Sequence, residues 1–85
     1  MDNFELEDLT EDIKDDLIRA VKQQINSEET LYVRTIYNEL IKKGYSEEDI
    51  LDKIAEQLQE IIEKMVDKDV EFDEEGYKEK LTSLI

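Results

Sequence analysis

Apolar residues recur along this 85-residue chain at the three- and four-residue spacing of α-helices, and they do so in four separate segments. No segment has the strict alternation of apolar and polar residues that marks a half-buried strand. The pattern predicts an all-α fold in which residues 1–85 form one compact four-helix domain, with three longer helices and a short C-terminal helix. Because the connections are short, we expect successive helices to pack as antiparallel neighbours.

The first helix is predicted from about Leu9 to Ile25, and residues 1–8 are expected to fray or to add a short extra turn. Either Asp8 or Thr10 has the polar side chain that caps a helix N-terminus. At 100° per residue, one face of this segment gathers the apolar side chains that we expect in the core. These are Leu6, Leu9, Ile13, Leu17, Ala20 and Val21.

A second helix is predicted from its cap, Ser27, to about Lys43. Gly44 then suits the left-handed backbone conformation that ends a helix, and Ser46 suits the N-cap of the next one. Between them, Tyr45 is expected to fold back onto the end of the second helix. The core face of this helix is predicted to hold Val33, Ile36, Tyr37, Leu40 and Ile41.

The third helix is predicted to be the longest, from about Glu47 to Val66, and to lie at the centre of the core. Its apolar stripe consists of Ile50, Leu51, Ile54, Ala55, Leu58, Ile61, Ile62 and Met65. A short fourth helix follows, with Asp73 as its cap and with Phe72 and Tyr77 in the positions of a hydrophobic staple. Its apolar face consists of Tyr77, Leu81 and Leu84.

In the segment that connects the third and fourth helices, every second residue is a carboxylate. These residues occupy positions one, three, five, seven and nine of an EF-hand-like loop. They are Asp67, Asp69, Glu71, Asp73 and Glu75. However, the glycine expected at the sixth position is Phe72, and the bidentate glutamate expected at the twelfth is Lys78. The segment therefore predicts a solvated acidic linker that caps a helix, with weak divalent-cation binding at residues 67–75 as an alternative.

The amino-acid composition removes most routes to chemistry, because the chain has no histidine and no cysteine and only two glycines. A serine has no imidazole to activate it, the usual zinc ligands are missing, and a phosphate-binding loop needs clustered glycines. Pairs of carboxylates occur on every predicted helix, so the spacing of any one pair does not identify it as a catalytic acid and base. We therefore expect a protein that is not an enzyme, with no catalytic, cofactor-binding or metal-binding residues.

The chain carries 25 acidic and 11 basic residues, which gives a formal net charge of −14. Nucleic acids and anionic membranes are poor partners for such a surface, whereas basic proteins and cations are better ones. The sequence has neither the features of a secretory signal nor an apolar run that approaches the ~18 residues of a membrane span. Together with the lack of cysteine, this predicts a cytoplasmic protein.

Three apolar side chains are candidates for binding a partner: Tyr32, Ile18 and Ile25. The two isoleucines flank the predicted core face of the first helix, and Tyr32 lies at the edge of the stripe of the second helix. They predict a secondary apolar patch of the kind that supports a homodimer, although the charge opposes self-association.

The leading hypothesis for the function is a protein–protein interaction or regulatory module. The alternative is an acidic inhibitor that imitates nucleic acid and occupies the groove of a basic DNA- or RNA-binding protein.

Two resemblances follow from these motifs. The segment Leu40-Ile41-Lys42-Lys43-Gly44-Tyr45-Ser46 resembles the glycine-aromatic turn of ubiquitin-associated domains, which bind ubiquitin through that loop. Because the predicted third helix is too long for that three-helix fold, we interpret this likeness as shared capping chemistry. The stretch from Val33 to Leu84, with its long third helix and Phe72-Asp73-Glu74-Glu75 turn, is similar to a group of small, acidic, uncharacterised bacterial helical proteins. That resemblance implies a helical fold and a cytoplasmic setting, and it implies no activity.

Overall fold

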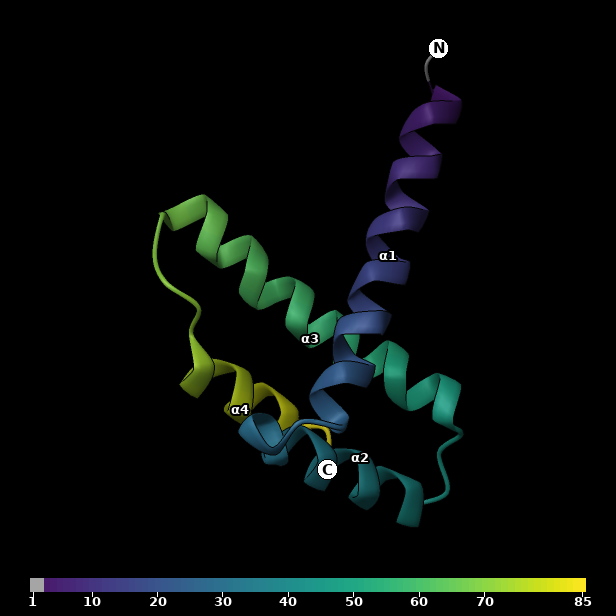
Figure 1. Cartoon of the computed structure of the whole chain (residues 1–85), viewed down its shortest axis with the longest axis vertical. Coiled ribbons are helices and arrows are strands. Elements are labelled where there is room, and N and C mark those ends of the chain that lie inside the picture. The colour runs from purple at the N-terminus through teal and green to yellow at the C-terminus, as the bar shows by residue number, and fades with distance from the viewer. Residues whose placement is uncertain (1–2) are drawn as a thin grey trace.

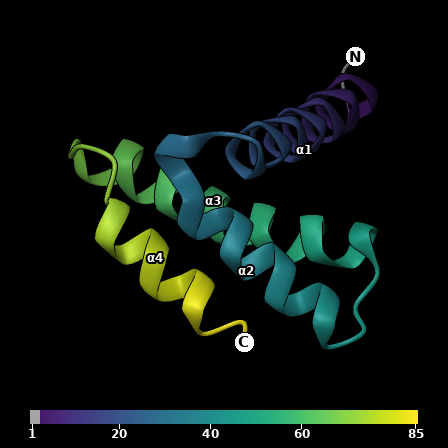
Figure 2. The ribbon, with the colours of Figure 1, turned by 60° about the horizontal axis from the view of Figure 1, so that its bottom comes forward.

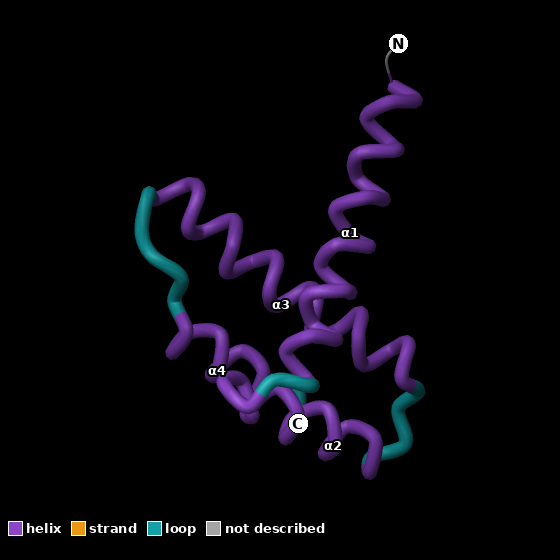
Figure 3. The backbone as a smooth tube through the Cα atoms, viewed as in Figure 1, coloured by secondary structure: helices purple, strands orange, loops and turns teal. Residues whose placement is uncertain are grey.

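The computed structural model describes the backbone of residues 3–85 and the side chains of residues 13–85. Over residues 3–85 the chain contains helices and no strand, and it forms a compact four-helix domain with short connections (Figure 3). The predicted all-α, four-helix fold is therefore confirmed. The elements are α1 (Asn3–Ile25), the short 3-10 helix η1 (Glu28–Thr30), α2 (Leu31–Lys42), α3 (Glu47–Lys68) and α4 (Glu74–Thr82).

Both α2 and α3 contact each of the other helices, and the most extensive contact is the one between α1 and α3 (Figure 1). α2 and α4 lie side by side, and both run opposite in direction to α3 (Figure 2). α1 differs, because it crosses α3 at a steep angle (Figures 1 and 2). The antiparallel packing expected of successive helices is thus confirmed for α2 with α3 and for α3 with α4, and it is wrong for α1 with α2, which also meet at a steep angle (Figures 1 and 2).

The buried side chains form one apolar cluster to which α3 contributes the most residues, and no charged side chain within residues 13–85 is buried. Ile54, Leu58 and Ile61 are almost completely shielded from solvent. The prediction that α3 is the central helix is therefore confirmed. The cluster consists of Leu17, Val21, Val33, Ile36, Leu40, Ile50, Leu51, Ile54, Ala55, Leu58, Ile61, Tyr77 and Leu81.

The first helix begins at Asn3, earlier than the start predicted near Leu9. Leu17 and Val21 are buried as expected, but Ile13 is 55% exposed, so its assignment to the core is wrong. The reason is the steep crossing, because the N-terminal half of α1 runs past α3 and away from the other helices (Figure 1). The side chains of four further residues for which we made predictions lie outside the described ones: Leu6, Asp8, Leu9 and Thr10.

The backbone of the turn between α2 and α3 has the predicted form, whereas the Tyr45 ring, which was predicted to fold back onto α2, is 40% exposed and has Lys53 Nζ of α3 at 5.2 Å from its centroid. Gly44 has a φ of 101°, and the backbone N–H groups of Gly44 and Tyr45 donate to Ile41 O and Leu40 O at 3.0 and 3.2 Å. These two bonds define a Schellman motif, which satisfies carbonyls that the helix end leaves without a partner. Ser46 Oγ then accepts the N–H of Asp49 at 3.2 Å and caps α3.

The start of α2 differs from the prediction. Ser27 Oγ accepts the backbone N–H of Glu29 at 3.2 Å, so Ser27 caps η1 and not α2. Thr30 Oγ1 donates to Gln24 O at 2.8 Å, which ties the short helix back to the end of α1. The chain thus turns between α1 and α2 through an extra helical turn that the apolar pattern did not indicate.

The connection between α3 and α4 is ordered by local contacts. Asp69, in a left-handed conformation with a φ of 54°, ends α3 slightly later than the predicted Val66. Asp73 Oδ1 accepts the N–H of Gly76 at 3.0 Å, and the Phe72 and Tyr77 rings lie 5.7 Å apart at 76°. The predicted cap and hydrophobic staple of α4 are therefore confirmed.

Candidate functional site

Tyr32, the aromatic candidate for partner binding, is held against α4. Its hydroxyl donates to Glu74 Oε2 at 3.2 Å, and its ring packs edge-on to Tyr77 with the centroids 6.0 Å apart. Lys78 Nζ lies 5.1 Å from the centroid of the same ring. Burial, followed by the negative charge of Glu74, raises the pKa of Tyr32 to about 12. Tyr32 therefore already has partners within the chain.

The two isoleucine candidates lie elsewhere, on the side of α1 that faces the beginning of α3. Ile18 and Ile25 are both half-buried, and each lines a shallow depression that also borders Lys22, Glu47 and Leu51. The structure thus brings Ile18 and Ile25 to the same helix–helix contact, whereas it places Tyr32 against α4. The three candidates do not form one patch.

The acidic segment between α3 and α4 is engaged in local structure. Asp73 caps α4 and lies 4.0 Å from Lys64 Nζ, and Asp69 forms the end of α3. Within residues 13–85, no group of three or more acidic side chains comes together in a way that could hold a metal ion. The alternating carboxylates that suggested an EF-hand-like loop are thus spread over a helix end, a loop and a helix start.

An apolar groove opens where α1 crosses α3, and we call it the α1–α3 groove. It has a volume of about 460 Å³, and five of its eight lining residues are apolar side chains contributed by both helices. Leu17 and Leu58 are its most buried members, whereas Ile13 and Ile62 are 55% and 38% exposed. The full lining consists of Ile13, Asp16, Leu17, Ala20, Leu58, Gln59, Ile62 and Glu63.

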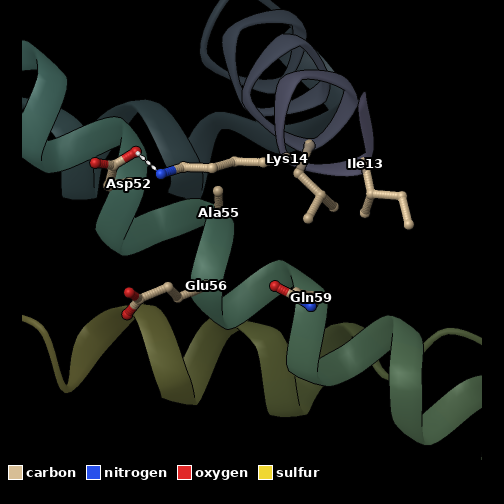
Figure 4. A pocket seen from close by; sticks show the side chains of 7 residues that line it. Ile13, Lys14, Asp52, Ala55, Glu56 and Gln59 are labelled. Atoms are coloured by element: carbon tan, nitrogen blue, oxygen red, sulfur yellow. Dashed lines mark ion pairs between the residues drawn. The ribbon is translucent and has the colours of Figure 1, made fainter. Parts of the chain in front are cut away.

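The neighbouring side of the same crossing has charged residues as well as apolar ones, and it shares Ile13, Leu17 and Gln59 with the groove. Figure 4 shows Lys14 of α1 reaching toward α3, where its Nζ lies 3.9 Å from Asp52 Oδ1. Glu56 and Gln59 complete that side, with Ala55 beneath Lys14 (Figure 4). An ion pair thus bridges one side of the crossing, whereas apolar side chains face each other across the α1–α3 groove.

Acidic side chains border the α1–α3 groove, and none of its eight lining residues is basic. Asp16 forms an ion pair with Arg19 at 3.0 Å, whereas Glu63 accepts a hydrogen bond from the neutral Gln59 at 3.3 Å. Residues 1–16, which include the part of α1 that extends beyond the crossing, contain eight carboxylates and one lysine in the sequence. The groove is therefore an apolar channel within a negatively charged region.

Sequence reasoning missed this groove because Ile13 and Ile62 fit the core stripes of their helices. A helical projection assigns them to the buried face, and only the angle at which the helices cross shows that they are exposed. No local signal marks that angle. Ile41, which was also predicted in the core, is 43% exposed and is not among the residues that line the groove.

No known protein family, no curated protein and no solved structure matches this chain. Over residues 3–85, none of the helices combines the length and the apolar character that a bilayer crossing requires.

Proposed function

We propose that this chain is a non-enzymatic protein-interaction module that binds a protein partner in the α1–α3 groove. The observation that carries the proposal is the pair of exposed isoleucines, Ile13 and Ile62, which face one apolar channel from two different helices. Single exposed apolar residues are ordinary, whereas contiguous apolar surface with a polar rim is typical of interaction sites. The composition supports the same reading, because the chain has no histidine or cysteine to act as nucleophile or base.

Photo-crosslinking from two matched positions tests the proposal. A photoreactive amino acid replaces Ile62 in the groove or, as the control, Ile41 on α2, since the two isoleucines are 38% and 43% exposed. After irradiation in cells, we expect a discrete covalent adduct from position 62 and not from position 41. The adduct should disappear when Ile13→Ser is added to the position 62 variant. Equal adducts from both positions, or none from position 62, would contradict the proposal.

The alternative, an acidic inhibitor that imitates nucleic acid, is favoured by the net charge of −14 and by the solvent access of every charged side chain within residues 13–85. Such a protein would bind its basic target through carboxylates, so Ile62→Ser should not change the affinity. The crosslinking comparison therefore separates the two functions. A cytoplasmic setting forms part of either proposal, because the chain lacks cysteine.

A further inference from the structure

We infer that the ligand of the α1–α3 groove is an amphipathic helix with basic flanks, supplied by a different protein. This inference rests on the proposed function and specifies the chemistry of the partner. Two features of the site carry it: the helical walls of the groove and the sign of the charge around it.

The walls suit a helix because both are themselves helices that diverge from the crossing (Figure 1). On α3, Leu58, Ile62 and Val66 follow each other at four-residue intervals, and their exposure rises from 3% to 38% to 74%. Residues at this spacing form a ridge along one side of a helix. The row of apolar side chains on α3 therefore continues beyond the groove. An amphipathic helix that lies in such a channel presents its own apolar stripe to both walls.

The second wall also extends beyond the crossing. The helix α1 starts at Asn3, and the ten residues before Ile13 add about 15 Å of helix at 1.5 Å per residue.

The charge selects a basic partner over a second copy of this chain. Asp16 and Glu63 border the groove, and residues 1–16 carry eight carboxylates against one lysine. A second copy would bring the same acidic surface into contact with itself, and each copy has a net charge of −14. Like charges that meet across an interface suppress association, whereas lysines and arginines on the flanks of a partner helix would be attracted.

The experiment measures binding of a fluorescent synthetic peptide of leucine and lysine, about 18 residues long, with its leucines at helical spacing. We expect one peptide to bind per chain at an ionic strength of roughly 0.1 M. Raising the ionic strength to roughly 1 M should weaken binding about tenfold or more, because the screening length falls from about 10 Å to about 3 Å. A peptide of the same composition with its leucines dispersed should bind much more weakly.

Matched variants locate the binding. We expect Ile62→Ser to lower the affinity about tenfold and Ile41→Ser to change it less than about twofold, since only Ile62 lines the groove. Circular dichroism should show that both variants keep the helical fold, because both side chains are at the surface.

Three results would overturn the inference. The first is an equal loss of affinity in both variants, and the second is equally tight binding of a peptide in which glutamate replaces lysine. The third is a dimer in sedimentation that salt strengthens and Ile62→Ser breaks, because the occupant would then be a second copy. If any of these occurs while position 62 still gives a crosslinked adduct, only the class of ligand is wrong. If the adduct is missing, the proposed function itself fails.

Discussion

Two parts of the apolar stripe of α3 differ in how completely other helices cover them. Along this stripe, α3 buries Ile54 and Ile61 so fully that at most 1% of either remains exposed. Toward α1, which crosses it steeply, α3 leaves Ile62 exposed beside an open groove. Because α1 crosses α3 steeply, the two helices diverge beyond their contact and leave part of the α3 stripe uncovered. The same apolar stripe can therefore serve as core in one place and as a binding surface in another.

The largest expected effect tests this contrast within one helix. We expect Ile54→Ala to lower the free energy of unfolding by about 3 kcal/mol, because it removes buried methyl groups and leaves a cavity. Ile62→Ala should lower it by no more than about half that amount, because Ile62 is 38% exposed and its truncation opens onto solvent without leaving an enclosed cavity. Urea unfolding followed by circular dichroism measures both. Similar losses for the two variants would show that the groove is closed in solution.

Alkaline pH should lower the free energy of unfolding, because Tyr32 of α2 and Tyr77 of α4 pack together in the folded protein. Burial and the charge of Glu74 raise the pKa of Tyr32 to about 12, and burial raises the pKa of Tyr77 as well. Since an unfolded tyrosine titrates near pH 10, the folded protein holds these protons more tightly. The resulting stability is fully present below pH 10 and is lost as the pH rises through about 12.

We expect the free energy of unfolding, measured with urea, to fall by more than about 1 kcal/mol between pH 10 and pH 12. Tyr77→Phe should reduce this dependence. The same variant should cost about 1 kcal/mol at pH 7, because the Tyr77 hydroxyl donates to Gln24 Oε1 at 2.7 Å. A flat profile from pH 8 to pH 12 in the unmodified protein would contradict the burial of these two phenols.

A smaller effect concerns the N-terminus of α4. We expect Asp73→Ala to lower the free energy of unfolding by about 1 kcal/mol, because Asp73 caps the helix through the N–H of Gly76. A Cβ at position 76 would lie 2.9 Å from Cγ of Asp73, so Gly76→Ala should also destabilise the protein. In the Asp73→Ala background, however, Gly76→Ala should stabilise it, because alanine is the better helix former.

This double-mutant cycle is measured by chemical unfolding of all four proteins. A change of sign between the two backgrounds is the expected result. If Gly76→Ala has the same effect in both, the glycine and the capping carboxylate do not interact, and the start of α4 is held by the Phe72–Tyr77 contact instead.

The smallest effect lies where α3 ends. Asp69 has a φ of 54°, a conformation that costs glycine less than any other residue. We expect Asp69→Gly to raise the free energy of unfolding by about 0.5 kcal/mol. The control is Asp67→Gly within the last turn of α3, which should lower it by up to about 1 kcal/mol. A thermal melt of each variant measures the difference, and a loss of stability in Asp69→Gly would contradict the helix end described here.

Features that depend on neighbouring residues were predictable from the sequence. Gly44 and Ser46 end one helix and begin the next as predicted, and Asp73 with Phe72 and Tyr77 begins α4 as predicted. A cap or a staple joins residues that are at most five positions apart, so the local sequence contains both partners. The exception is Ser27, which caps η1 because nothing in the apolar pattern distinguishes a 3-10 turn from the first turn of an α-helix.

By itself, the sequence determined that the chain is helical, where most of its helices end, and that α3 supplies the centre of the core. Only the tertiary structure decided that α1 crosses α3 steeply, that Ile13 and Ile62 remain exposed, and that Tyr32 is held by α4. The crossing angle depends on how side chains of helices far apart in sequence interdigitate, and a helical projection contains no information about that packing.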